Sequence, residues 1–227
     1  MLQKSFFKKD FTSNLSVHDI LMLSCAFSCM LLVGRAVVTG FVVYAFLMWN
    51  LFLAFIPYGI TQWVQMENKV TRHKPVFFLV FTTWLLFIPN SFYIVTDLFH
   101  LYKFDDAPKW FDLLLIFSFA WNGLLLGLLS VRAIEKMIEK SWGQGFSTVI
   151  LFAVMWLCAF GVYIGRYLRF NSWDIVAQPF TLLHEMLNIL LHPFQNKLEW
   201  GMVSTYAVFM LMIYITLKKI SGTFYPK

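Results

Sequence analysis

The chain has 227 residues, of which 59% are hydrophobic and only 13% are charged, and its formal net charge is +6. Soluble domains are about 45–50% apolar and about 25% charged, so this composition excludes an ordinary soluble globular protein. The positive charge does not indicate nucleic-acid binding, because the sequence has no basic patch with interleaved base-reading residues.

Six stretches are long and apolar enough to cross a bilayer as helices, which takes about 20 residues each. We expect these spans at residues 19–38, 41–64, 76–94, 111–133, 146–168 and 201–217. Arg35 lies near the end of the first stretch, and we expect its long side chain to snorkel to the membrane interface. The sequence therefore predicts an all-α integral membrane protein, a six-span helical bundle that forms a single polytopic domain over residues 1–227.

The distribution of Lys and Arg predicts the orientation, because short cytoplasmic loops carry an excess of these residues. With the N-terminus in the cytoplasm, 12 of the 18 Lys and Arg residues fall on the cytoplasmic side and 6 fall outside. Both termini are therefore predicted to be cytoplasmic.

Glycines occur four apart in the fourth and fifth predicted spans, as Gly123 and Gly127 and as Gly161 and Gly165. Small residues at this spacing let helix backbones approach closely in lipid. We therefore expect both helices to have a tightly packed neighbour.

Two asparagines, Asn50 and Asn122, fall near the middle of predicted spans. A buried amide needs hydrogen-bond partners, and in membrane proteins these usually come from another helix. We expect interhelical hydrogen bonds here in preference to ligand contacts.

Residues 175–192, between the fifth and sixth predicted spans, have the period of an amphipathic helix. The apolar stripe consists of Val176, Phe180, Leu183, Leu187, Leu190 and Leu191. A strongly amphipathic helix is expected to lie in the membrane plane, here as an interfacial helix on the outer side.

Polar and ionisable side chains are costly within a membrane, so each is a candidate for function. Their densest group follows Pro89, which removes a helical hydrogen bond and can kink or break the helix. If a helix resumes at Asn90, one face of it carries Asn90, Tyr93, Asp97 and His100. We assign these four residues to a ligand-binding site, in which Asp97 and His100 are also the candidate catalytic residues. The alternative is that Asn90 caps the restarted helix while Asp97 and His100 form an interfacial pair.

A second polar group ends the fifth predicted span and contains Arg166, Arg169 and Asp174. Guanidinium groups suit bidentate binding of phosphate or carboxylate. Two arginines on the outer side also run against the positive-inside bias. We assign all three residues to the same ligand-binding site. A structural ion-pair network with Asp97, Asp112 or Asp174 is an equally weighted alternative.

Metal-dependent hydrolysis by Asp97 and His100 is a third interpretation, but the sequence offers an incomplete set of ligands for it. The string HEMLN at residues 184–188 has Asn188 where a zincin has its second histidine. We therefore predict no metal site and no cofactor, and the sequence leaves open whether the protein is an enzyme.

Four strings carry a family resemblance: FLMWNLFLAFIP at 46–57, WLLFIPNSFYIVTDLFHL at 84–101, WFDLLLIFSFAWNGLLLG at 110–127 and GVYIGRYLRFNSWDI at 161–175. As a set they resemble a bacterial multi-spanning membrane family catalogued as a domain of unknown function, number 1361. The resemblance covers about residues 40–217. It implies a multi-pass protein of the bacterial plasma membrane and brings no activity with it.

These patterns together predict an outer-face site for an anionic lipid headgroup or a lipid-linked envelope precursor, which the protein would transport, flip or transfer. The alternative is a non-enzymatic membrane scaffold or accessory subunit, in which the charges form a structural network and the amphipathic helix docks a membrane protein partner. The expected partners are membrane lipids, with no nucleic acid.

Overall fold

The computed structural model describes residues 15–67, 73–170 and 177–224, and these residues form helices joined by short connections. The helices are α1 (Val17–Thr39), α2 (Phe46–Met66), α3 (Lys74–Tyr93), the 3-10 helix η2 (Ile94–His100), α4 (Lys109–Trp142), α5 (Gln144–Arg166), α7 (Pro179–Leu191) and α8 (Lys197–Phe224). Within these ranges there is no strand, so the all-helical prediction is confirmed.

Five segments are long and apolar enough to cross a membrane: α1, α3 continued by η2, α4, α5 and α8. The chain is therefore a multi-pass membrane protein. The second predicted span corresponds to α2, whose mean hydropathy is lowered by Asn50, Gln62 and Gln65 and which is not among the five. A sixth crossing and the orientation remain predictions.

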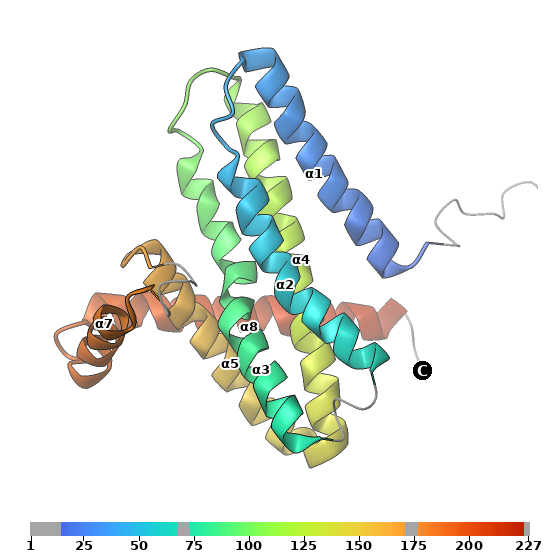
Figure 1. Cartoon of the computed structure of the whole chain (residues 1–227), viewed down its shortest axis with the longest axis vertical. Coiled ribbons are helices and arrows are strands. Elements are labelled where there is room, and N and C mark those ends of the chain that lie inside the picture. The colour runs from blue at the N-terminus through green and yellow to red at the C-terminus, as the bar shows by residue number, and fades with distance from the viewer. Residues whose placement is uncertain (1–14, 68–72, 171–176, 225–227) are drawn as a thin grey trace, which may run out of the picture.

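The centre of the bundle is α4, the most buried of these segments, which packs against α1, α2, α3 and α5. Figure 1 shows α2, α3 and α4 side by side, with α1 leaning on the upper part of α4 and α8 crossing behind the bundle. One cluster of buried apolar side chains joins α3, α4, α5 and α8, and a second joins α1, α2 and α4. A membrane helix with apolar residues on every side fits such a central position.

The polypeptide remains helical through Pro89, so of the two predicted effects, a kink or a break, the break does not occur. The helix changes at Ile94 instead, where it tightens into η2. Asn90 therefore lies inside α3 and caps nothing; its Nδ2 atom donates a hydrogen bond to the Phe87 carbonyl at 3.0 Å. Proline is tolerated within membrane helices when neighbouring helices support the backbone, and here the Pro89 ring packs against Gly161 of α5.

All four glycines of the two predicted pairs lie against α3 or η2, so the expected close packing is confirmed. A Cβ atom added to any of these glycines would lie within 3.2 Å of a neighbour: Ile94 at Gly123, Ser91 at Gly127, Pro89 at Gly161 and Tyr93 at Gly165. The glycines of α4 and α5 thus form a smooth surface on which the α3–η2 segment lies. This surface fixes the position of the polar residues that follow Pro89.

Replacing Gly161 by Ala is expected to lower the free energy of unfolding by about 1–3 kcal/mol, the usual cost of overpacking. The new Cβ would lie 2.7 Å from Pro89 Cβ, and a proline ring cannot rotate away. Gly201→Ala in α8 is the control, because its Cβ meets nothing within 4 Å. The control gains helix propensity of up to about 1 kcal/mol. Thermal unfolding in detergent micelles measures both, and equal midpoints would contradict the prediction.

The mid-span asparagine of α4 links two helices, as expected. Asn122 accepts a hydrogen bond from Ser24 Oγ at 2.7 Å and donates to the Ser24 carbonyl at 3.0 Å and to Ser28 Oγ at 2.8 Å. All three bonds join α4 to α1. They satisfy the buried amide and leave it no ligand-binding role.

The helix α7 packs on the bundle through residues outside the predicted apolar stripe. Its buried or partly buried contacts come from Leu182, Met186 and Ile189, none of which belongs to the predicted apolar stripe. In that stripe Val176 lies outside the described residues, and the other members are exposed. Apolar side chains therefore lie on two sides of α7. The exposed stripe is the side available to lipid, and its position in the membrane plane remains a prediction.

Candidate functional site

The site is built around the carboxylate of Asp97, which η2 places in the interior with only 1% of its surface exposed. Asn50 of α2 donates a hydrogen bond from Nδ2 to Asp97 Oδ2 at 2.7 Å. On the other side, Arg166 Nη1 at the end of α5 lies 3.9 Å from Asp97 Oδ1. A buried charge is costly without such partners. The carboxylate thus joins α2, η2 and α5, and Asn50 makes the interhelical hydrogen bond expected of it.

Arg166 is held by its neighbours on several sides. Its Nη2 atom lies 3.4 Å from His100 Nδ1, and its guanidinium lies 5.1 Å from the centre of the Phe99 ring. His100 Nδ1 in turn lies 3.3 Å from the Asp97 carbonyl oxygen. The structure therefore brings Arg166 beside Asp97 and His100, which lie more than 60 residues before it in the sequence.

A cavity of about 520 Å³ opens beside this cluster, and we call it the polar pocket. Its lining residues are Tyr93, His100, Lys103, Gly165, Arg166 and Arg169. Three of them are cationic, and no described carboxylate lines the pocket. Such a lining attracts an anion. The site predicted from the sequence does not include Lys103, although this residue follows His100 by only three positions.

Arg169 holds an unusual backbone conformation in this pocket. Its φ is +60°, which is the left-handed region and which costs a residue with a Cβ about 1–2 kcal/mol. It lies just after α5, where Phe170 N donates a hydrogen bond to the Ile164 carbonyl at 3.4 Å. Strain of this kind is concentrated at functional positions.

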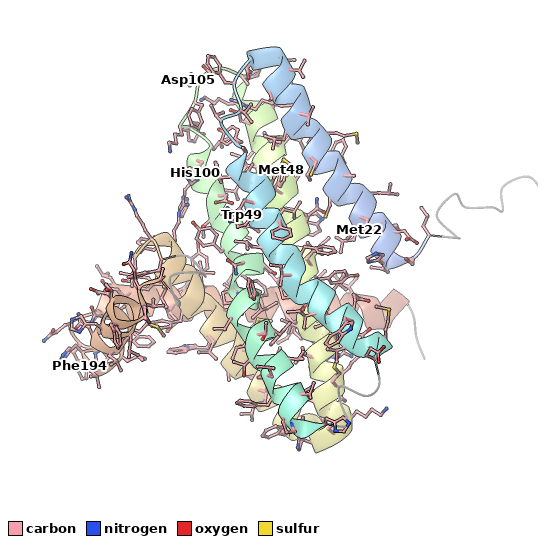
Figure 2. All side chains as sticks on the ribbon, in the orientation of Figure 1. Met22, Met48, Trp49, His100, Asp105 and Phe194 are labelled. Atoms are coloured by element: carbon pink, nitrogen blue, oxygen red, sulfur yellow. The ribbon has the colours of Figure 1, made fainter. Side chains whose placement is uncertain are left out.

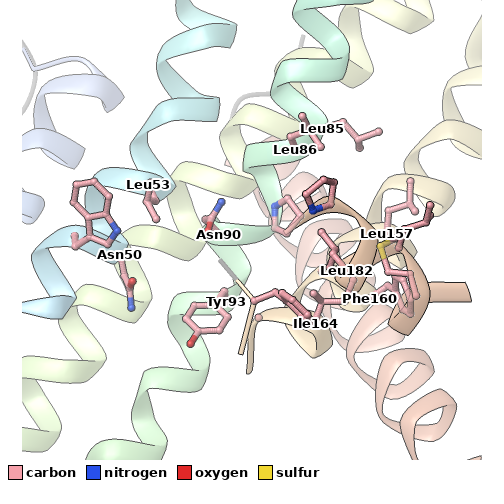
Figure 3. A pocket seen from close by; sticks show the side chains of 18 residues that line it. Asn50, Leu53, Leu85, Leu86, Asn90, Tyr93, Leu157, Phe160, Ile164 and Leu182 are labelled. Atoms are coloured by element: carbon pink, nitrogen blue, oxygen red, sulfur yellow. The ribbon is translucent and has the colours of Figure 1, made fainter. Parts of the chain in front are cut away.

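A second cavity, of about 560 Å³, adjoins the polar pocket, and we call it the apolar groove. Figure 3 shows it between side chains of α2, α3, α5 and α7, among them Leu86, Phe160 and Leu182. Its polar members include Asn50, Asn90 and Tyr93. Tyr93 and Gly165 line both cavities, so the polar pocket and the apolar groove meet at these two residues.

The residues assigned to the site from the sequence fall into three positions. Asn90 and Tyr93 line the apolar groove, Asp97 lies buried beside it, and His100, Arg166 and Arg169 line the polar pocket. Asp174 lies outside the described residues. Across the described ranges no group of three His, Cys, Asp or Glu side chains is placed to hold a metal ion.

Arg35 does not snorkel to the interface, which corrects the expectation for the first span. Its side chain is 1% exposed and donates to Asp112, from Nε to Oδ1 at 2.7 Å and from Nη2 to Oδ2 at 3.2 Å. The Tyr44 ring lies 4.7 Å from the guanidinium, and the Tyr44 hydroxyl is 3.3 Å from both Asp112 Oδ2 and the His100 carbonyl oxygen. Asp112 is thus committed to Arg35 and does not pair with Arg166 or Arg169. His100, whose carbonyl oxygen lies near the Tyr44 hydroxyl, is seen in Figure 2 below the connection that carries Asp105.

A separate ionic cluster lies toward the other end of α4, around Glu135, which is 6% exposed. Its carboxylate accepts a hydrogen bond from Lys218 Nζ of α8 at 2.7 Å. It also accepts from Tyr214 of α8 and from Arg132, one helical turn away. These contacts tie α8 to α4. Each carboxylate oxygen has a partner, so the cluster is structural.

The family model described as "Protein of unknown function (DUF1361)" matches residues 49–213. No curated protein and no solved structure matches the chain. The matched range contains every described residue of the polar pocket and the apolar groove.

Proposed function

The chain belongs to the DUF1361 family, a family of proteins of unknown function, and we propose that its two adjoining cavities bind an anionic membrane lipid. The lipid headgroup occupies the polar pocket, and the upper part of its hydrocarbon chain lies in the apolar groove. The observation that carries this proposal is that Tyr93 and Gly165 line both cavities. A single molecule with an anionic end and an apolar end fits such a pair.

The three cations of the polar pocket have different tasks. Arg166 is fixed by Asp97, His100 and Phe99, so it presents its charge without further ordering. Arg169 and Lys103 are exposed, and neither forms an ion pair with a described carboxylate. They are therefore available to a phosphate, which arginine binds through charge-assisted hydrogen bonds.

The proposal includes the location of the site. With α2 as a sixth crossing and both termini in the cytoplasm, the polar pocket lies at the outer face of the bacterial plasma membrane. A lipid or a lipid-linked envelope precursor reaches the apolar groove laterally from the bilayer. After binding, the protein transports, flips or transfers that molecule.

Arg169→Gly is expected to weaken binding of an anionic lipid by about ten-fold or more, the effect of losing one charge-assisted hydrogen bond. The same change relieves the left-handed strain, so the protein should melt at the same or a higher temperature. Native mass spectrometry after incubation with phosphatidylglycerol measures lipid binding. Arg166→Gln is measured as a second variant. Lys109→Gln is the matched control, since Lys109 pairs with Asp105 at 2.5 Å and does not line the pocket. Equal retention in wild type and Arg169→Gly would contradict the proposal.

The second candidate function is that of a membrane scaffold or accessory subunit. It is favoured by the exposed apolar stripe of α7, formed by Phe180, Leu183, Leu187, Leu190 and Leu191. In this case the Asp97–Arg166 pair is structural, and the stripe docks a membrane protein. Recovery of one defined protein with wild type, lost in Leu187→Ser/Leu191→Ser and kept in Arg169→Gly, would select this alternative, because neither leucine lines the apolar groove.

A further inference from the structure

The polar pocket is lined mainly by hydrogen-bond donors. Arg166 ends α5, Arg169 follows it, and Lys103 lies in the connection after η2. Arginine and lysine side chains carry only donors, so they suit a headgroup whose oxygens accept. A sugar or glycerol hydroxyl also donates, and among the lining side chains only His100 and Tyr93 could accept from it. Phosphate oxygens need no acceptor, so the lining favours a headgroup built from phosphate groups.

Most donors of these cations are not used within the protein. One N–H group of the Arg166 guanidinium approaches His100 Nδ1 at 3.4 Å, and Asp97 Oδ1, at 3.9 Å, is beyond hydrogen-bond distance. Lys103 Nζ lies 5.7 Å from the centre of the Phe104 ring, near the outer limit of a cation–π contact. Several phosphate oxygens can therefore be bound at once while the carboxylate of Asp97 keeps its hydrogen bond from α2.

The pocket is also too long for one phosphate group. Its lining runs from Tyr93, at the junction with the apolar groove, to His100 and Lys103. A 3-10 helix rises about 2 Å per residue, so the backbones of Tyr93 and His100 lie about 14 Å apart along η2. The cavity of about 520 Å³ has room for about 17 groups the size of a water molecule, at about 30 Å³ each. A single phosphate would fill a minor part of this space.

We propose, building on the lipid site proposed above, that the headgroup is a diphosphate, two phosphate groups in series, attached to the hydrocarbon chain in the apolar groove. Arg166 and Arg169 follow Gly165, which lines both cavities, so they bind the phosphate that is attached to the chain. Lys103 comes from a different segment, the connection after η2, and it binds the terminal phosphate. The protein therefore distinguishes a diphosphate lipid from a lipid with one phosphate.

Farnesyl diphosphate and farnesyl phosphate are the probes, because they share one hydrocarbon chain and differ by one phosphate. Native mass spectrometry is expected to show that wild type retains the diphosphate about ten-fold better, the effect of one further charge-assisted contact. Equal retention of the two probes, with phosphatidylglycerol still bound, would overturn this inference and leave the proposed lipid site standing. Retention of none of the three molecules would overturn both.

Lys103→Gln tests the assignment of the terminal phosphate. Lys103 is exposed, so the variant should melt at the temperature of wild type and lose most of its preference for the diphosphate. Lys103→Arg keeps the charge and should keep the preference. Lys109→Gln is the matched control, since Lys109 pairs with Asp105 and does not line the pocket. A preference that survives in Lys103→Gln, with the variant folded, would overturn the proposal.

Discussion

Replacing Arg35 by methionine is expected to lower the free energy of unfolding by about 3–5 kcal/mol, the cost of leaving one partner of a buried ion pair uncompensated. Asp112 is fully buried, and both of its oxygens are bonded to Arg35. The Tyr44 hydroxyl alone cannot stabilise the carboxylate that remains. For a chain of this size the midpoint of thermal unfolding in detergent should fall by about 6–20 °C.

The double variant Arg35→Met/Asp112→Leu separates the ion pair from the packing of α1. Removing both charges together is often neutral or stabilising, so most of the lost stability should return. The Tyr44 hydroxyl keeps the His100 carbonyl oxygen as an acceptor in this variant. A double variant as unstable as Arg35→Met would show that the arginine acts through packing and that the charge pair contributes little. An arginine that snorkelled would give almost no effect in the single variant.

Helix content and the five apolar segments follow directly from the sequence, because apolar runs of this length have few other structures available in a membrane. The glycine pairs also predict correctly which helices have close neighbours. The identity of the neighbour does not follow, since α3 contacts both α4 and α5 through side chains that any apolar helix carries. The effect of Pro89 on its helix is likewise not predictable from the local sequence. Its effect on the helix depends on the α5 backbone, which no local pattern encodes.

The candidate site is predictable in its residue types and only partly in its contacts. Asp97, His100 and Arg166 meet, as their shared position at the ends of predicted spans suggests. Asn50 is 47 residues from Asp97, and its amide could have bonded any buried group. The pairing of Arg35 with Asp112 spans 77 residues and depends on the lean of α1. Long-range polar partners depend on interhelical geometry, which periodicity does not determine.

The face by which α7 packs is a further case in which sequence periodicity is insufficient. The stripe with the strongest apolar period is exposed, and Leu182, Met186 and Ile189 contact the bundle instead. In a membrane protein an apolar face has two possible environments, lipid and protein, and both satisfy the hydrophobic effect. Because of the same ambiguity, the sequence does not predict the apolar groove, which Leu182 helps to line.

Replacing Glu135 by glutamine is expected to lower the free energy of unfolding by about 3 kcal/mol, the lower end of the range for a broken buried ion pair. The carboxylate is 6% exposed, and it is the acceptor for Lys218 and Arg132. Both cations are partly exposed, so water compensates part of the loss. The Tyr214 hydroxyl retains an acceptor in the glutamine amide oxygen, which keeps the loss below that of Glu135→Ala.

The same substitution should loosen α8 before the rest of the bundle, because Glu135 accepts hydrogen bonds from two side chains of α8 and so joins α8 to α4. Limited proteolysis is expected to cut α8 faster in Glu135→Gln than in wild type, at a temperature where the other helices remain protected. Glu139→Gln is the matched control, since Glu139 lies one turn further along α4 and is exposed. If both variants melt and are cut alike, the ionic cluster adds nothing, and α8 is held by its apolar packing on α5. A faster cut in Glu135→Gln alone would assign the attachment of α8 to one buried carboxylate.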